Sequence, residues 1–175
     1  NLSLIPGTVG AAPIQNIGAY GVELKDTFEA LEAIEISTGE KQYFRKEECQ
    51  FGYRDSIFKK ALKGKFFITN IVLRLLKEPI LITSYGNVHE RLKKLNKKEY
   101  TIKDVSEVII EIRRSKLPDP EIKGNAGSFF KNPVINNELF SAIRKSFPDI
   151  PSFEHSGKRK KIEVLIGNIP ATAYE

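Results

Sequence analysis

The feature that most constrains the fold of this chain is the order of two hydrophobic periodicities along its 175 residues. Segments rich in β-branched and aromatic residues dominate the first half, whereas segments with apolar residues at helical spacing follow in the second half. Strands first and helices later predict an α+β fold, and the change in pattern indicates that the chain spans parts of two domains.

Three strands are predicted in the first half. Residues 27–37 alternate as a half-buried strand does, residues 38–40 form a turn, and residues 41–45 return as the second strand of a hairpin. The inward positions expected in the first strand are Phe28, Ala30, Ala33 or Ile34, and Ile36. Residues 65–76 are apolar and β-rich, which predicts a central strand.

Two amphipathic helices are predicted in the second half. Thr101 and Asp104 have the chemistry of a helix start, and Pro118 and Pro120 end the helix predicted over residues 101–116. Its buried face is expected to contain Val105, Val108, Ile109 and Ile112. The second helix covers 137–147, with the inward residues Leu139, Phe140, Ile143 and Phe147.

Composition limits the class of protein. The chain is 41% hydrophobic, enough for a real core, and its net charge of +6 favours anionic partners such as nucleic acid, nucleotides or phosphorylated small molecules. Cys49 is the only cysteine, no apolar run approaches a membrane span, and no signal peptide is present, so we expect a cytoplasmic protein. The chain starts at Asn1 and has no methionine, which suggests a fragment.

The first candidate site is the uncharged segment 1–21, which contains Gly7-x-x-Gly10 and Gly18-x-x-Gly21. This spacing is neither a Walker loop nor a dinucleotide fingerprint. Small residues nevertheless allow backbone N–H groups to surround a diphosphate, and nearby side-chain amides can contact a heterocycle. The alternative is a buried turn that needs glycine for packing.

Arg54 is the second candidate. It lies among aromatic and aliphatic residues in segment 51–59, where a partly desolvated guanidinium stabilises a developing oxyanion. The alternative is a surface pair between Arg54 and Asp55.

Ser128 lies between small residues and two phenylalanines, and neither His89 nor His155 is placed beside it by the sequence. A Ser–His–Asp triad is therefore poorly supported. A neutral serine needs no base if it donates its proton, as a general acid, to a strongly basic carbanion. The alternative is a turn serine that caps backbone groups.

Two basic runs, 89–98 and 158–161, are interpreted as an exposed helix face and a solvated tail or loop. A nucleic-acid site would need aromatic stacking partners, and these are sparse nearby.

Three long motifs resemble one enzyme family. The segments SLIPGTVGAAPIQNIGAYGVE, CQFGYRDSIFK and KLPDPEIKGNAGSFFKNP, in this order and spacing, are similar to the UDP-N-acetylenolpyruvoylglucosamine reductase family over residues 1 to about 155. The resemblance implies an FAD-binding module of the vanillyl-alcohol-oxidase type with a substrate domain. It also implies NADPH-dependent reduction of the enolpyruvyl UDP-sugar for peptidoglycan synthesis.

The resemblance assigns roles to twelve residues of this sequence. The implied FAD cradle contains Gly7, Gly10, Ala11, Gln15, Asn16 and Gly18. The implied catalytic residues are Arg54, which polarises the substrate carboxylate, and Ser128, which protonates the carbanionic carbon. The implied substrate-binding residues are Tyr53, Tyr85, which belongs to a loop that closes over the diphosphate, Lys116 and Asn132. No metal is expected.

The resemblance also predicts the domain organisation. Residues 1–82 correspond to the second part of the FAD module, 83–115 to the tyrosine loop and a crossover helix, and 116–175 to the beginning of the substrate domain. The family's first flavin subdomain and its C-terminal catalytic glutamate have no counterpart here, and residues 162–175 depart from the family pattern. We expect the isolated chain to be inactive and the complete protein to be a monomer, with no nucleic-acid or membrane partner.

Two other functions remain as alternatives. One is a different oxidoreductase of the same flavin superfamily, and the other is a basic module that binds nucleic acid, whose binding would be salt-sensitive.

Overall fold

The structure, a computed structural model, describes residues 1–119, 121–124, 132–150, 152–155 and 159–162. It divides into two compact units, Asn1–Lys116 and Leu117–Glu175, which we call unit 1 and unit 2. Strands and helices both contribute to the fold, as predicted for an α+β chain.

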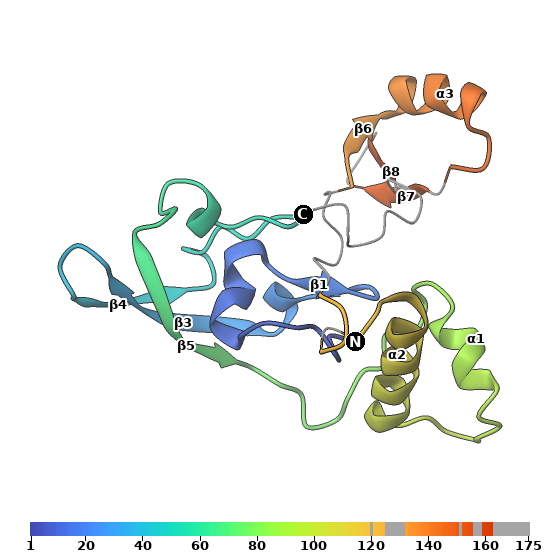
Figure 1. The fold of residues 1–175 in the computed structure, drawn as a ribbon, viewed down its shortest axis with the longest axis horizontal. Coiled ribbons are helices and arrows are strands. Elements are labelled where there is room, and N and C mark those ends of the chain that lie inside the picture. Colours follow the sequence, from blue (N-terminus) through green and yellow to red (C-terminus); the bar gives the residue numbers. More distant parts are fainter. Residues whose placement is uncertain (120, 125–131, 151, 156–158, 163–175) are drawn as a thin grey trace. The chain divides into compact units, whose positions relative to one another are not determined.

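Unit 1 contains a three-stranded antiparallel sheet with the order β4-β3-β5 (Figure 1). Its strands are β3 (Phe28–Glu35), β4 (Lys41–Arg45) and β5 (Phe66–Leu73). The predicted hairpin is confirmed, because β3 and β4 pair antiparallel and the turn between them contains Gly39 at φ +76°. Glycine adopts this left-handed conformation without steric cost, which lets the chain reverse within a few residues.

The prediction of a central strand over residues 65–76 is wrong, because the central strand is β3 and β5 lies at the sheet edge. β3 pairs with both neighbours and buries Ala30, Leu31 and Ala33, whereas Ile68 is the only residue of β5 that is buried. Apolar composition indicates a strand, but the order of the strands depends on pairings that are distant in the sequence.

The expected alternation along β3 holds only in part. Phe28, Ala30 and Ala33 are buried as predicted, whereas Ile36 is exposed. The pairing of β3 with β5 shifts register twice, between Phe28 and Ala30 and between Glu32 and Ala33. Each shift interrupts the two-residue repeat of side-chain directions, so alternation read from the sequence loses its phase.

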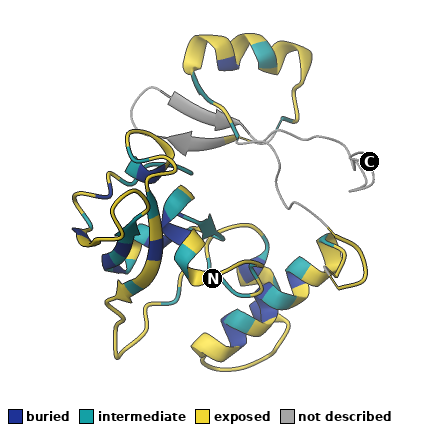
Figure 2. Ribbon diagram, turned by 60° about the vertical axis from the view of Figure 1, so that its left-hand side comes forward, coloured by how far each residue is buried: buried dark blue, intermediate teal, exposed yellow. Residues whose placement is uncertain are grey.

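One face of the sheet packs against short elements that lie outside the sheet. These elements are the 3-10 helices η1 (Val9–Gln15), η2 (Leu24–Asp26) and η3 (Ile57–Lys59). Between η1 and η2 the chain forms a separate two-stranded ladder of β1 (Gly18–Ala19) and β2 (Val22–Glu23). Aromatic rings meet edge to face in the shared core, with ring centroids 4.9 Å apart for Phe28 and Phe51 and 5.3 Å for Phe44 and Phe58. Figure 2 shows this buried core in dark blue.

The remainder of unit 1 contains the helices α1 (Val88–Lys93) and α2 (Ile102–Lys116). The four apolar residues predicted to face inward from α2 are all buried, and they pack with Val88 and Leu92 of α1. Segment 89–98 therefore does more than form an exposed face, because Leu92 is fully buried.

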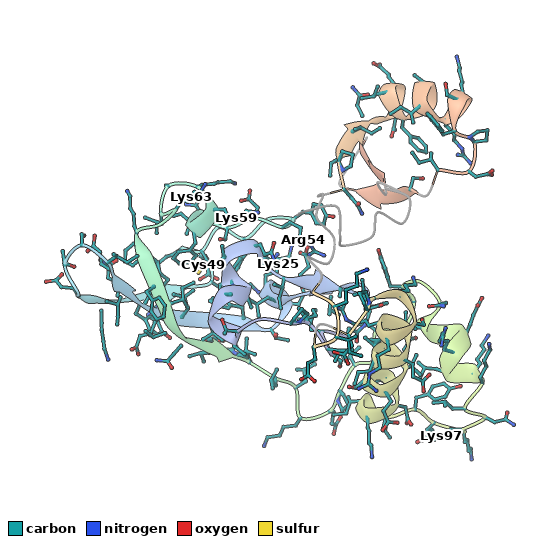
Figure 3. All side chains as sticks on the ribbon, in the orientation of Figure 1. Lys25, Cys49, Arg54, Lys59, Lys63 and Lys97 are labelled. Carbon is teal, nitrogen blue, oxygen red and sulfur yellow. The ribbon has the colours of Figure 1, made fainter. Side chains whose placement is uncertain are left out.

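The start of α2 confirms the predicted capping chemistry. The Thr101 N–H donates to the Asp104 carboxylate at 2.8 Å, and the Asp104 N–H donates to the Thr101 hydroxyl at 3.2 Å. The Lys97 ammonium also contacts the buried Asp104 carboxylate (Lys97 is labelled in Figure 3). These contacts satisfy backbone groups that the first helical turn leaves unpaired.

Unit 2 combines one helix with a small antiparallel sheet of order β6-β8-β7. Its elements are β6 (Val134–Asn136), α3 (Asn137–Ser146), β7 (Ser152–His155) and β8 (Arg159–Ile162). The interpretation of 158–161 as a loop or tail is wrong for the residues in β8, because that strand pairs with both neighbours. Charge composition does not report this pairing, which uses backbone groups.

The helix α3 confirms the prediction of a helix over 137–147 within one residue at its end. The Asn136 side chain accepts a hydrogen bond from the Leu139 N–H at 2.8 Å and so caps the helix. Phe140 is buried, but Leu139 and Phe147 are exposed, contrary to the predicted inward face. Among the described residues of α3, Phe140 alone is buried.

Candidate functional site

Two of the three recognised motifs contact each other through partly buried hydrogen bonds in unit 1. The Ser56 hydroxyl donates to the Ile14 carbonyl at 2.7 Å, and the Asn16 amide donates to the Gly52 carbonyl at 2.9 Å. Ser56 also accepts from the Phe58 N–H at 3.2 Å, which caps η3. Residues about 40 apart in the sequence therefore form one region, which we call the motif junction.

Arg54 lies at the motif junction and is half-buried (Figure 3). Its guanidinium donates a hydrogen bond from Nη2 to the Gly18 carbonyl, and its Cζ lies 5.3 Å from the centroid of the Tyr53 ring. An arginine over an aromatic face is attracted by the negative face of the ring. The guanidinium therefore lies between the backbone of the first motif and an aromatic side chain of the second.

The surroundings of Arg54 differ from a simple surface pair with Asp55. The Asp55 carboxylate forms an ion pair with Lys60 at 2.6 Å, while the Arg54 guanidinium reaches the first motif. The Lys59 ammonium donates to the Arg54 carbonyl at 3.1 Å and adds a second cation to this region. Arg54 and Lys59 thus place two cations at the junction, beside the carboxylates of Glu23 and Asp55.

A tight turn presents Arg54. The N–H of Gly52 donates to the carbonyl of Asp55 at 2.9 Å, and the N–H of Asp55 donates back at 3.3 Å. Arg54 is one of the two residues between them and has φ +52°. A left-handed conformation is unfavourable for a residue with a Cβ, so the surrounding contacts must hold it.

Asn16 lies at the centre of the motif junction and has no exposed surface. Besides its bond to Gly52, its amide donates to Glu23 Oε2 at 3.2 Å, and its Oδ1 accepts from the Lys25 N–H at 2.9 Å. Glu23 is in turn paired with the Lys25 ammonium at 2.9 Å. The Asn16 side chain thus directs its polar atoms toward this chain, and its predicted contact with a cofactor stays a prediction.

The three predicted cradle glycines face different surroundings. A Cβ at Gly10 would stand 2.9 Å from the Ile68 carbonyl oxygen, and one at Gly18 would stand 2.8 Å from both Arg54 Nη1 and the Val22 carbonyl oxygen. Gly7, with φ +106°, has no atom within 4 Å of that place. Gly10 and Gly18 therefore serve close packing, whereas Gly7 borders open space.

The fit of FAD to these residues is partial. Gly7 borders open space, and Ala11 and Gln15 are exposed on the adjoining segment. These three are accessible to a large ligand, while Gly10, Asn16 and Gly18 are already occupied by contacts inside the chain. Sequence resemblance treats the six residues as one set, and the structure separates them into an accessible group and a packing group.

Tyr85 is held beside the turn between β1 and β2. Its ring meets the Tyr20 ring edge to face, with centroids 6.4 Å apart, and its Cβ lies 3.3 Å from the place of a Cβ on Gly21. Asn1 links the same two segments, since its amide donates to the carbonyls of Tyr20 at 2.7 Å and Ile82 at 2.8 Å. The predicted loop tyrosine is therefore positioned by the first motif.

The remaining predicted site residues are not brought together within one unit. Lys116 is the exposed last residue of α2 in unit 1, and Asn132 lies in unit 2. Ser128 lies outside the described residues. Its role therefore stays a prediction from the sequence.

Sequence reasoning missed two structural residues of the junction, Ser56 and Glu23. Ser56 precedes the first residue of η3 and is a recognisable N-cap. Glu23 and Asp26 form a capping box around η2, in which each side chain accepts from the backbone of the other. Local capping patterns indicate both residues, but no local pattern reports that Glu23 also contacts Asn16.

Cys49, labelled in Figure 3, lies in the hydrophobic core of unit 1. Burial, followed by the charges of Glu48 and Glu47, raises the pKa of the Cys49 thiol to about 12. A thiol with this pKa is protonated at neutral pH and is a poor nucleophile. Cys49 therefore acts as a small apolar core residue.

The described residues offer neither a metal-binding cluster nor a membrane-spanning helix. Three or more His, Cys, Asp or Glu side chains do not gather there in a way that would hold a metal ion. Among the helices of the described segments, none is both long enough and apolar enough to cross a membrane.

Comparison with known proteins gives strong sequence matches. The chain is 56% identical over 151 residues to a UDP-N-acetylenolpyruvoylglucosamine reductase of Amoebophilus asiaticus, covering 86% of this chain and 44% of the relative. Proteins with the same name from Flavobacterium johnsoniae and Pseudomonas aeruginosa are 51% and 49% identical, each covering 93% of this chain and 48% of the relative. No family model matches the chain.

A crystal structure of the Thermus caldophilus UDP-N-acetylenolpyruvylglucosamine reductase is also similar, at 27% identity and a TM-score of 0.48. The match covers 74% of this chain and 38% of that one. A TM-score at this level does not by itself define a shared fold.

These sequence relatives are, by their names, reductases, which are oxidoreductases. The chain is similar over most of its length to the UDP-N-acetylenolpyruvoylglucosamine reductase family, and it spans about half the length of the relatives that it matches. The resemblance inferred from the three motifs is thereby confirmed.

Proposed function

We propose that the intact gene product carrying this sequence reduces UDP-N-acetylenolpyruvoylglucosamine to UDP-N-acetylmuramate, a precursor of peptidoglycan, with FAD as cofactor and NADPH as reductant. The observation that carries this proposal is the 56% identity to a relative with the corresponding name. Support from the structure is the motif junction, where segments of two family motifs converge on a half-buried arginine.

Reduction of the enolpyruvyl double bond adds a hydride to one carbon and a proton to the adjacent carbon. The hydride would come from bound FAD, which NADPH would reduce. The chain is proposed to hold the cofactor through the accessible residues Gly7, Ala11 and Gln15. Its own side chains must then stabilise the charge that develops and deliver the proton.

Arg54 is proposed to stabilise that charge. Hydride addition at the β-carbon places negative charge on the α-carbon and its carboxylate, and a nearby guanidinium lowers the energy of this distribution. Arginine carries five N–H donors, of which one is used by the Gly18 carbonyl among the described contacts. Partial burial strengthens the interaction, because fewer water molecules screen the charge.

Ser128 is proposed to donate the proton to the α-carbon, as the family resemblance implies. A carbanion next to a carboxylate is far more basic than an alkoxide, so the neutral hydroxyl acts as the acid without help from a base. Tyr53, Tyr85, Lys116 and Asn132 are proposed to bind the UDP-sugar. Lysine and amide groups suit a diphosphate, because each oxygen accepts several charge-assisted hydrogen bonds.

The test follows the two half-reactions of the intact gene product under anaerobic conditions. NADPH should bleach the absorbance of oxidised flavin, and the enolpyruvyl UDP-sugar should restore it with formation of UDP-N-acetylmuramate. If NADPH bleaches the flavin and the UDP-sugar does not restore it, the protein is a different flavin oxidoreductase. If no flavin is bound, the proposal fails altogether.

A further inference from the structure

The fully buried side chain of Asn16 makes three hydrogen bonds inside the motif junction. Only Asn16, Ser56 and Asp104 are buried polar or charged side chains in the described part of the chain. Burying an amide is costly unless its donors and acceptor find partners. The partners of Asn16 are backbone groups and one carboxylate of this chain, so its role must be sought inside the junction.

The hydrogen bonds fix the orientation of the Asn16 amide. Oδ1 faces the Lys25 N–H at 2.9 Å, which only an acceptor satisfies, while Nδ2 faces the Gly52 carbonyl and the Glu23 carboxylate, which only a donor satisfies. Rotation of the amide by 180° would place an acceptor against the acceptors of Gly52 and Glu23, and a donor against the Lys25 N–H. The carbonyl of Gly52 is therefore held by a donor with one defined orientation.

The Gly52 carbonyl begins the turn that presents Arg54. Gly52 and Asp55 exchange backbone hydrogen bonds, and between them Arg54 takes the unfavourable left-handed conformation. The guanidinium then returns to the carbonyl of Gly18, two positions after Asn16. Asn16, Gly52, Arg54 and Gly18 thus form a closed ring of hydrogen bonds and short chain segments.

We propose that Asn16 is a positioning residue for Arg54: by holding the Gly52 carbonyl, its buried amide sets the place and direction of the Arg54 guanidinium. This inference rests on the proposed function, in which Arg54 stabilises charge on the substrate. It differs from the role in cofactor binding that the family resemblance implies for Asn16. Glu23 contributes indirectly, because its carboxylate accepts a hydrogen bond from the Asn16 amide and so helps to orient that amide.

The main variant is Asn16→Asp in the intact gene product loaded with FAD. The substitution preserves size and the acceptor for the Lys25 N–H, but it turns an oxygen toward the Gly52 carbonyl and the Glu23 carboxylate. Reoxidation of the reduced flavin by the UDP-sugar should slow by about 100-fold, the effect of a small misplacement of a reacting group. Reduction by NADPH and the Kd for FAD, measured by fluorescence quenching, should stay within about twofold of the parent.

The same substitution is then made in an Arg54→Ala background. If Asn16 acts through Arg54, the two effects on reoxidation do not add, and Asn16→Asp causes no further slowing. Additive slowing would overturn the proposal, as would a weakened Kd for FAD with an unchanged reoxidation rate. If Arg54→Ala alone leaves the reoxidation rate unchanged, the role assigned to Arg54 under the proposed function is wrong. That result differs from the two outcomes that would overturn the role of Asn16.

A second pair of variants guards against misfolding. Asn16→Gly removes the amide but accommodates φ +45° without strain, and Glu23→Gln keeps an acceptor for the amide without the charge. Asn16→Gly should reproduce the selective slowing, and Glu23→Gln should produce a smaller loss in the same half-reaction. Normal reoxidation in Asn16→Gly would overturn the proposal.

Discussion

The guanidinium of Arg54 donates a hydrogen bond to the carbonyl of Gly18, 36 residues earlier in the chain. The second motif is thereby anchored on the backbone of the first, and no Cβ fits at Gly18 without displacing the Arg54 guanidinium or the Val22 carbonyl. A glycine and an arginine that look independent in the sequence are therefore coupled, because the guanidinium packs where a side chain at position 18 would begin.

Gly18→Ala should therefore destabilise the 175-residue chain by about 1–3 kcal/mol, the usual range for overpacking. The flexible guanidinium is able to move away from a new Cβ, but the Val22 carbonyl, at 2.8 Å, belongs to the backbone of β2. Urea denaturation measures the change. Gly124→Ala is the matched control, because no atom of the described residues lies within 4 Å of its Cβ position, and equal losses in both variants would contradict the packing role of Gly18.

Asp104 should make the stability of the chain sensitive to acid. Hydrogen bonds from Lys97 and then from Thr101 lower the pKa of its carboxyl from 3.8 to about 2. A group with a lowered folded-state pKa contributes stability that is complete above its unfolded value and is lost as pH falls toward the folded value. The contribution should thus be present at pH 5 and above and should decline between about pH 4 and pH 2.

Asp104→Asn tests this dependence through urea denaturation at pH 7 and at pH 3. The variant should be less stable than the parent at pH 7, and the difference should shrink at pH 3. Glu107→Gln is the control, since the Lys103–Glu107 pair at 3.8 Å is exposed and should contribute at most about 0.5 kcal/mol. A loss in Asp104→Asn that is the same at both pH values would rule out the ionised carboxylate as its source.

Cys49 should be unreactive toward thiol reagents in the folded chain. Its side chain has no exposed surface, and burial raises its pKa to about 12, so the thiolate is scarce even at pH 8. Titration with an aromatic disulfide reagent should show slow modification in buffer and immediate modification of one thiol in denaturant. Rapid modification of the native chain would show that the core around Cys49 opens readily.

Ser128→Ala in the intact gene product should separate the two half-reactions. Flavin reduction by NADPH needs no proton from this residue and should be unchanged, while reoxidation by the UDP-sugar should slow about 10²- to 10⁴-fold, as the loss of a general acid does. Stopped-flow absorbance of the flavin reports both rates. Slowing of both half-reactions to the same extent would count against the proton-donor role.

The isolated 175-residue chain should retain little or no FAD and should lack measurable turnover. It spans 44% to 48% of the length of the relatives described above, and only part of the predicted cradle is accessible within it. The absorbance spectrum of the purified chain checks this expectation directly. A yellow protein with a flavin spectrum would contradict it.

Local chemistry made several elements predictable from the sequence. The helix α2, its start at the Thr101–Asp104 pair and its buried face depend on residues at most four positions apart, so periodicity and capping were sufficient. The hairpin of β3 and β4 is equally local, since its turn and both strands lie within 18 residues of each other (Phe28–Arg45). The three motifs are contiguous segments, so the sequence alone was also sufficient to show the resemblance to the reductase family.

Tertiary structure alone decided the order of the strands and the surroundings of the candidate site. The central position of β3, its two register shifts against β5, and the place of β8 depend on pairing partners distant in the sequence. The side-chain amide of Asn16 has the donors and acceptor of a ligand-binding group, yet its N–H donors are used by Gly52 and Glu23. A polar side chain binds a ligand or stabilises the fold according to the groups that pack beside it. These groups come from distant parts of the sequence, so no local pattern predicts them.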